Sequence, residues 1–236
     1  MVIYSDFLKR CENYHRTKDA LYAANNYLEI ISDRKTWDDL DSLTIEVIEH
    51  DLFSKYLFDW GKMNRSFAIN KRKACYQLLL ETIQKESGNI QDLRKLRIES
   101  VQLDSGPSHE KVKSVYLAFR DFCSDVAKKQ PTASAKILHI MVPNLFVIWD
   151  WKYVRSKLRL GTDPASYLRY LKQKQSQLQD LLISYRQVDP SPDLADLIDA
   201  LETAHEKFLS EEIGLKRPTH EPITKLLDEF QVMQAS

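Results

Sequence analysis

The residues best suited to chemistry lie in one stretch, Pro131 to Gly161, which reads PTASAKILHIMVPNLFVIWDWKYVRSKLRLG. Lys136 and His139 are three positions apart, so they share one face of a helix. Asp150 follows the longest apolar run and opens a basic segment. Such side chains can serve as nucleophiles, bases or charge stabilisers. Each also has a structural interpretation: Lys136 could reach solvent, His139 could be a hydrogen-bonded core residue, and Asp150 could cap the next helix.

Other familiar sites have no counterpart in the sequence. It contains no GxGxxG, GxxxxGK[ST] or GxSxG pattern, and Asp38, Asp39 and Asp41 cluster at a helix start, where acids suit the helix dipole. The histidines are too scattered to form an HxxxH or HExxH pair. They are His15, His50, His109, His139, His205 and His220. We therefore expect no metal ligands and no cofactor.

The cysteines and the apolar runs indicate a cytoplasmic protein outside the membrane. Cys11, Cys75 and Cys123 are widely spaced, which excludes a disulfide scaffold, a CxxC site and a cysteine-ligated cluster. The N-terminal residues lack the pattern of a signal peptide. The run from Ile137 to Trp151 is interrupted by polar residues and proline and is too short to span a bilayer.

The charges balance overall but are unevenly distributed. The chain has 34 basic and 34 acidic residues. The segment 62–73 carries five basic residues and no acid, and 151–174 carries seven basic residues against one acid. By contrast, 189–229 carries eleven acids against four bases. This asymmetry predicts a basic face and an acidic face on the folded protein.

The elements that position these residues are helices. Most glycines and prolines fall between segments of helical periodicity, which predicts an all-α globular bundle of about nine or ten helices. We expect one domain, 1–236, in which two lobes could meet near 104–107. We expect Ser5 and Thr17 to cap two opening helices. Further helices are expected at 43–60, 71–87, 108–130, 131–143, 151–158, 164–185, 193–209 and from 222 onward.

Two helix ends and one ambiguous segment depend on single local signals. Gly61 is expected to end the helix 43–60, and Gly88-Asn89 to end the helix 71–87. The segment 90–103 alternates like a strand, but a lone strand has no partner, so we expect a short helix and a loop there.

The stretch 131–161 resembles the core of the helix-hairpin-helix DNA glycosylase superfamily. The resemblance begins at Asp150 and runs DWKYVRSKLRLG. Asp150, Arg155, Arg159, Leu160 and Gly161 stand where the family pattern has Asp, Arg, Arg, Leu and Gly. Lys136 stands where some members carry a catalytic lysine. The family's glycine-rich hairpin has no counterpart, since the chain reads QPTASA there.

The resemblance implies a glycosylase or lyase site and a DNA partner. Lys136 would be the nucleophile, with its pKa lowered by burial, and Asp150 would stabilise positive charge on the sugar. A flipped base would stack on aromatic side chains, and basic side chains would hold phosphates. The stacking candidates are Trp149, Trp151 and Tyr153. The phosphate-binding candidates are Lys152, Arg155, Lys157 and Arg159. Independently of the resemblance, the earlier basic segment is interleaved with aromatic residues, as nucleic-acid surfaces often are, and adds Lys62, Arg65, Lys71 and Arg72 as candidates.

Two functional hypotheses follow. In the first, the protein associates with nucleic acid through a glycosylase-like core that has or lacks catalytic activity. In the second, it is a non-catalytic helical module for protein–protein interaction, and 131–161 is simply its core. The last helix, ITKLLDEFQVM, is amphipathic and could dock on its own domain or on a second copy of the chain.

Overall fold

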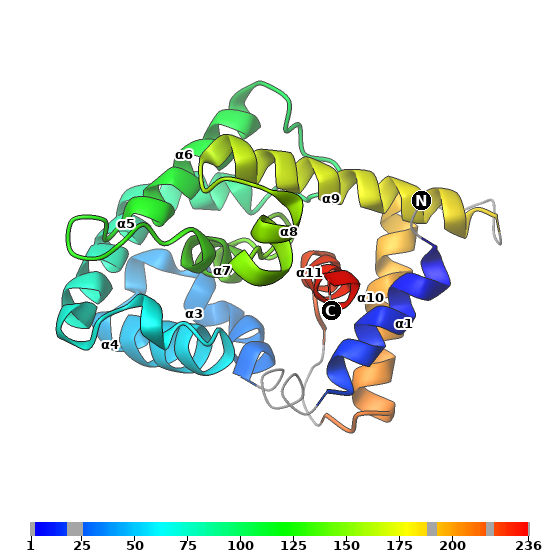
Figure 1. Cartoon of the computed structure of the whole chain (residues 1–236), viewed down its shortest axis with the longest axis horizontal. Coiled ribbons are helices and arrows are strands. Elements are labelled where there is room, and N and C mark those ends of the chain that lie inside the picture. Colours follow the sequence, from blue (N-terminus) through cyan, green and yellow to red (C-terminus); the bar gives the residue numbers. More distant parts are fainter. Residues whose placement is uncertain (1–2, 18–25, 188–192, 216–219, 236) are drawn as a thin grey trace.

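The computed structural model describes residues 3–17, 26–187, 193–215 and 220–235. Within these ranges every regular element is helical and no strand occurs, which confirms the all-α prediction (Figure 1). No helix among the described residues is long and apolar enough to cross a membrane.

The helical elements follow one another along the whole described chain. A helix over 26–32 precedes α3. The labelled elements are α1 (Tyr4–His15), α3 (Arg34–Asp38), η1 (Leu40–Ser42), α4 (Ile45–Val47), η2 (Ile48–Trp60), η3 (Asn64–Ser66), η4 (Ile69–Lys71), α5 (Arg72–Leu93), α6 (Pro107–Asp121), α7 (Pro131–Met141), η5 (Trp151–Arg155), α8 (Ser156–Leu158), α9 (Pro164–Tyr185), α10 (Leu194–Glu211) and α11 (Ile223–Ala235). Of these, η2 and η5 are π-helices.

Local capping explains the two helices whose starts the sequence predicts best. Asp163 accepts a hydrogen bond from the backbone N–H of Ser166, and proline occupies the first position of α9. Asp193 forms a reciprocal capping box with Asp196 at the start of α10. These contacts confirm the predicted starts of both helices.

Gly61 ends η2 as predicted, and the structure supplies the reason. A Cβ at Gly61 would lie 2.6 Å from the Leu57 carbonyl oxygen, so only glycine fits there. The backbone then turns through Lys62, which has a left-handed φ of 53°. The π-helical hydrogen bonding of η2 was not predicted.

Three local predictions need correction. Gly88 does not end α5, which continues to Leu93, because packing of α5 on η2 and α6 outweighs the weak helix-ending preference of glycine. Ser5 lies inside α1, whose N-cap is Ile3. The helix predicted to reach 130 ends at Asp121 and continues as turns. The cap predicted at Thr17 would open a helix in residues 18–25, which lie outside the described residues.

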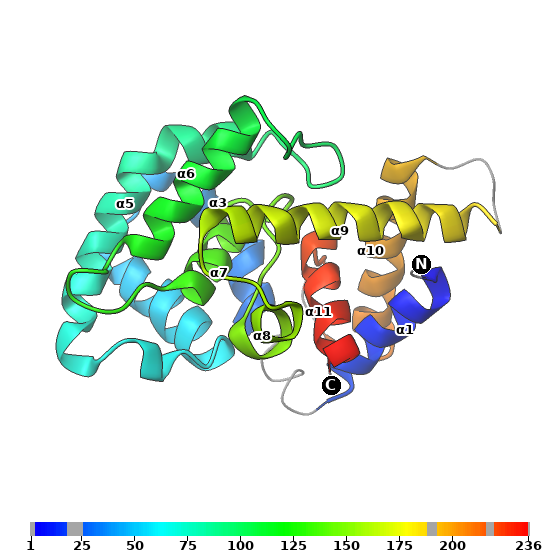
Figure 2. The same ribbon diagram turned by 45° about the horizontal axis from the view of Figure 1, so that its top comes forward.

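The elements pack around one continuous apolar core. α9 runs along one side of the molecule and joins the part built from α3 to α7 to the part built from α1 and α10 (Figures 1 and 2). α11 lies between these two parts, and residues 221–231 are all buried. The last helix therefore docks on its own domain, which leaves these residues no exposed surface for a second copy. The loop at 104–107 leads from α5 to α6, and these two helices pack against each other.

Candidate functional site

Lys136 points into the protein. Only 8% of the residue is exposed, so the solvent-reaching alternative is wrong. Its ammonium nitrogen lies 4.1 Å from the centre of the Trp60 ring and 3.5 Å from the carbonyl oxygen of Gly61. The Tyr56 hydroxyl donates to the backbone carbonyl of Lys136 at 3.1 Å. The ring of Tyr56 stacks on the ring of Trp60. The end of η2 thus covers the lysine.

The packed helices bring Lys136 together with charged residues of α11. Lys225 Nζ lies 5.8 Å from the centre of the same Trp60 ring and 3.8 Å from Asp228 Oδ2. Asp228 and Asp150 both act electrostatically on Lys136. We call Lys136, Asp150, Lys225 and Asp228 the interior charge cluster. The two residues singled out from the sequence therefore share one electrostatic environment.

Burial moves two groups of this cluster toward neutrality. It lowers the pKa of Lys136 to about 8, even though Asp228 and Asp150 favour the charged form. It raises the pKa of Asp228 to about 7, although Lys225 opposes the change. A lysine with such a pKa is partly a free amine at neutral pH and can act as a nucleophile or a base. Perturbed pairs of this kind are enriched at functional sites.

His139 is a structural residue. Its Nδ1–H donates to the Phe146 carbonyl at 2.8 Å, because a carbonyl oxygen can only accept. Its Nε2 then accepts from the Tyr27 hydroxyl at 2.7 Å. The histidine is fully buried, and these bonds confirm the interpretation as a hydrogen-bonded core residue.

The predicted base-stacking role does not suit Trp149. The side chain is fully buried, packs on Tyr167 and Tyr170, and donates from Nε1 to the Pro131 carbonyl. It could meet a base only if the core opened. The side chains of Trp151 and Tyr153, the other two candidates, lie outside the described part of the structure.

The second basic segment divides into buried and exposed residues. Arg155 is buried, donates to Thr132 Oγ1 at 3.1 Å and lies over the Trp149 ring. It therefore fastens η5 to the start of α7, a contact that competes with a phosphate role. Asp150 is half-buried, and its carbonyl accepts from the backbone N–H of Arg155 at 2.9 Å. Three other basic residues around η5 and α8 are exposed: Lys152, Lys157 and Arg159.

The first basic segment meets the same end of α7. Four of its five basic side chains are exposed: Lys62, Arg65, Lys71 and Lys73. Arg72 instead folds the segment, because it donates to the carbonyls of Phe67 and Asn64 and stacks over Phe58.

The loop that precedes α7 contacts this segment and contributes two more basic residues. Gln130 donates to the Ser66 carbonyl at 3.3 Å, which places the loop before α7 against the first basic segment. Lys128 and Lys129 of that loop are exposed. They were not among the residues predicted from the sequence to bind phosphates. Both basic segments thus approach the N-terminal end of α7 (Figure 2). We call Lys62, Arg65, Lys71, Lys128, Lys129, Lys152, Lys157 and Arg159 the basic face.

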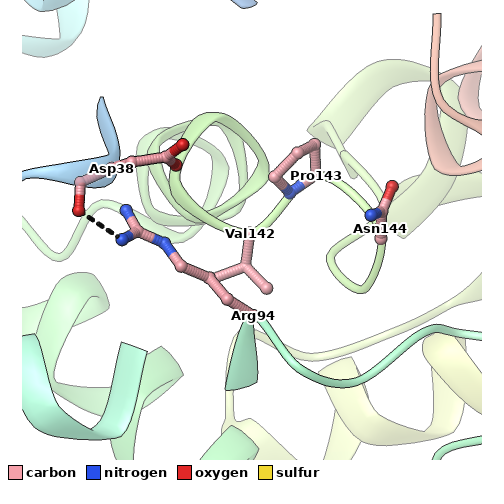
Figure 3. Close-up of a pocket in the computed structure, with 5 residues that line it drawn as sticks. All are labelled: Asp38, Arg94, Val142, Pro143 and Asn144. Atoms are coloured by element: carbon pink, nitrogen blue, oxygen red, sulfur yellow. Dashed lines mark hydrogen bonds between the residues drawn. The ribbon is translucent and has the colours of Figure 1, made fainter. Parts of the chain in front are cut away.

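A separate surface pocket of about 410 Å³ lies beside the C-terminal end of α7 (Figure 3). Its lining includes Arg94, Val142, Pro143 and Asn144. The Arg94 guanidinium donates to the backbone carbonyls of Asp38, at 2.8 Å, and of Met141, at 2.9 Å, as well as to that of Trp37. These bonds give the arginine a structural role in joining α3 to α7.

No protein-family model matches the chain, and comparisons with curated proteins and with solved structures return no match. Lys225 and Asp228 were missed because the last helix was interpreted as an ordinary amphipathic one. The sequence did contain a signal for them. The segment KLLDE places three charged residues around two leucines in an otherwise mostly apolar helix, which indicates charges close to the core.

Proposed function

We propose that the protein binds nucleic acid through the basic face. The observation that carries this proposal is the meeting of separate basic segments at one end of α7, through the Gln130–Ser66 and Arg155–Thr132 contacts. Exposed lysines and arginines that follow a phosphate backbone release counterions on binding. The proposal concerns affinity for phosphates, since base contacts rather than phosphate contacts set sequence preference.

The test is a salt titration of binding to labelled single- and double-stranded DNA. Wild-type affinity should fall linearly with the logarithm of salt concentration. Replacing Lys128 and Lys129 with alanine should reduce that slope by up to about 2, or about 1 for each lysine at a phosphate. The matched control is alanine at Lys95 and Lys207, which are exposed elsewhere and should leave the slope unchanged.

Absence of binding at low salt would reject the proposal and favour the protein–protein module. Equal effects of the test and control substitutions would also contradict it, because they would indicate attraction by general surface charge. Neither outcome depends on any catalytic role of the interior.

A second candidate function is a lyase reaction at Lys136, favoured by the lowered pKa of this lysine beside two carboxylates. Its free amine would attack the sugar aldehyde of an abasic site and expel water, which forms a Schiff base. Borohydride reduces that imine to a stable amine and leaves a covalent protein–DNA product. Because Trp60 and Gly61 cover the amine, the end of η2 must move for DNA to enter.

Borohydride trapping on abasic DNA separates the two functions. A trapped product in wild type that Lys136→Arg abolishes would support the reaction. If wild type binds DNA but gives no trapped product, Lys136 does not form a Schiff base and the lyase reaction is rejected.

A further inference from the structure

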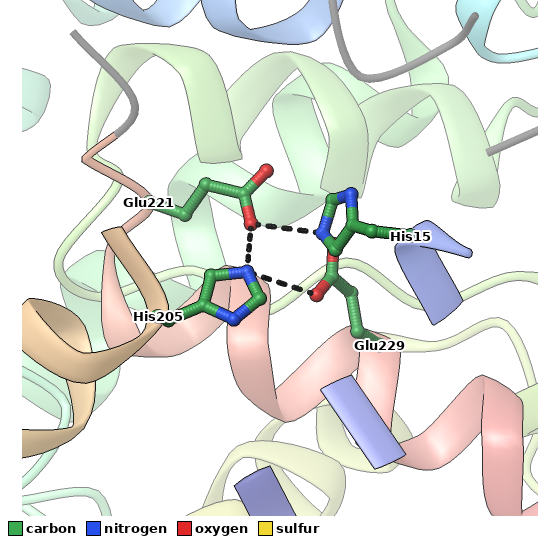
Figure 4. Close-up of side chains that lie close together, drawn as sticks. All are labelled: His15, His205, Glu221 and Glu229. Atoms are coloured by element: carbon green, nitrogen blue, oxygen red, sulfur yellow. Dashed lines mark hydrogen bonds and ion pairs between the residues drawn. The ribbon is translucent and has the colours of Figure 1, made fainter. Parts of the chain in front are cut away.

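Four metal-ligating side chains from distant parts of the chain meet in the interior, on α11 and the helices beside it (Figure 4). His15 ends α1, His205 lies in α10, Glu221 comes just before α11, and Glu229 lies within α11. One potential ligand atom of each lies within 4.8 Å of all the others. The four residues are at most 1% exposed.

The distances between the ligand atoms suit a shared cation. His15 Nε2 lies 2.9 Å from Glu229 Oε1 and 3.3 Å from Glu221 Oε2. His205 Nε2 lies 3.0 Å from Glu221 Oε2 and 3.8 Å from Glu229 Oε2. Tetrahedral Zn²⁺ bonds of about 2.0–2.1 Å place neighbouring ligand atoms about 3.4 Å apart. The observed separations bracket that value, although the two histidines face different oxygens of Glu229. A rotation of that carboxylate with small adjustments of the other side chains would complete the geometry.

The cluster leaves hydrogen-bonding capacity unused. Glu221 Oε1 and Glu229 Oε2 are buried and have no hydrogen-bond partner, and neither has Nδ1 of His15 or His205. Buried carboxylate oxygens without partners are costly and rare. This is an independent sign that the four side chains surround something other than one another.

The charges also favour a dication. Lys225 Nζ lies 2.6 Å from Glu229 Oε1 and 3.8 Å from Asp228 Oδ2. Glu221 and Glu229 carry a formal charge of −2 when ionised, and Lys225 offsets one unit of it. A dication would offset the remaining negative charge while both imidazoles stay neutral, which is the form in which histidine ligates.

We propose that His15, His205, Glu221 and Glu229 bind a divalent transition-metal ion, with Zn²⁺ as the ion that the two-imidazole, two-carboxylate donor set fits. Four protein ligands with no solvent-facing position are typical of structural zinc sites, whereas catalytic sites keep one position open. The ion would fasten α11 to α1 and α10. It would thereby hold Asp228, the neighbour of Glu229, beside Lys136.

The alternative is a metal-free ion network. Burial disfavours the charged form of His15, but Glu229 and Glu221 outweigh it and raise the pKa of His15 to about 10. A protonated His15 would then satisfy part of the carboxylate charge. This network still leaves Glu221 Oε1 and Glu229 Oε2 without a hydrogen-bond partner. A dication next to both carboxylates would stabilise these oxygens electrostatically.

The test uses the full-length protein, stripped with a chelator and then titrated with Zn²⁺. We expect one tightly bound ion per chain after desalting and a melting temperature raised by about 5 °C or more. Co²⁺ in place of Zn²⁺ should give the visible absorption of a four-coordinate site. Glu229→Gln and His205→Gln should lose the bound ion. The matched control is His220→Ala, at an exposed histidine near the cluster, which should retain it.

The wild-type protein alone can overturn the proposal. Less than about 0.2 equivalents of bound Zn²⁺, with no change in melting temperature at excess Zn²⁺, Mn²⁺, Fe²⁺, Co²⁺ or Ni²⁺, would establish the metal-free network. One equivalent that survives both ligand substitutions would place the ion elsewhere, for instance at a thiol. A ligand variant that fails to fold does not affect the wild-type titration, which still decides between the two.

Discussion

Lys174 offers a direct test of how strongly this interior perturbs a buried charge. It lies in α9 with no exposed surface. Its ammonium nitrogen is 2.9 Å from Gln177 Oε1, 3.0 Å from Gln231 Oε1 and 3.4 Å from the Leu227 carbonyl oxygen. These neutral acceptors orient the amine, but they do not replace the solvation that a full charge has in water.

The sign of the pH effect follows from the direction of the pKa change. Burial lowers the pKa of Lys174 from 10.5 to about 7, and the attraction of Asp228 only partly opposes it. Between these two values the unfolded chain binds a proton that the folded protein does not. The contribution of Lys174 to the free energy of unfolding therefore becomes more favourable as pH rises from 7 toward 10.5. Below pH 7 the folded protein carries the buried charge, and Lys174 destabilises it by the full amount.

The perturbation is Lys174→Met, measured by urea denaturation at several pH values. The two pKa values imply that wild type gains about 2 to 3 kcal/mol relative to the variant between pH 6 and pH 9. Only this change with pH is diagnostic, because the lost hydrogen bonds shift stability equally at every pH. The control is Lys172→Met on the same helix, where the lysine is 37% exposed and pairs with Asp104. Parallel curves for wild type and Lys174→Met would refute the reasoning.

Three further predictions concern other hydrogen-bonded or buried groups. Arg94→Ala removes donors to three carbonyls and should lower the free energy of unfolding by about 2 to 4 kcal/mol in urea; a loss under 0.5 kcal/mol would contradict it. Tyr27→Phe leaves His139 Nε2 without its donor and should cost about 1 to 2 kcal/mol, measured likewise; an unchanged stability would indicate another donor. Burial raises the pKa of all three thiols, so a thiol reagent should modify them at least about 100-fold more slowly in the native protein than in denaturant. Rapid modification of the native protein would contradict their burial. The thiols belong to Cys11, Cys75 and Cys123.

Some features could be predicted because their causes are local. Asp163 and Asp193 begin their helices through contacts with residues three positions later. Gly61 ends η2 because of the carbonyl four residues before it. The apolar run after Ile137 was also predictable as core, because apolar side chains are stabilised by burial away from water. Gly88 shows the limit: its preference for ending a helix is weak, and packing of α5 on η2 and α6 overrides it.

Local sequence patterns were enough to predict the helical class, these helix starts and the burial of the central stretch, because capping and periodicity depend on residues within about one helical turn. Which charges meet depends instead on the tertiary packing. Lys136 lies near Asp228, and His15 lies beside Glu229, although 92 and 214 positions separate them along the chain. No local pattern encodes such pairs, because they depend on how α1, α7 and α10 enclose α11. The charged residues of α11 were missed for the same reason, since an amphipathic pattern does not reveal that other helices surround the whole helix.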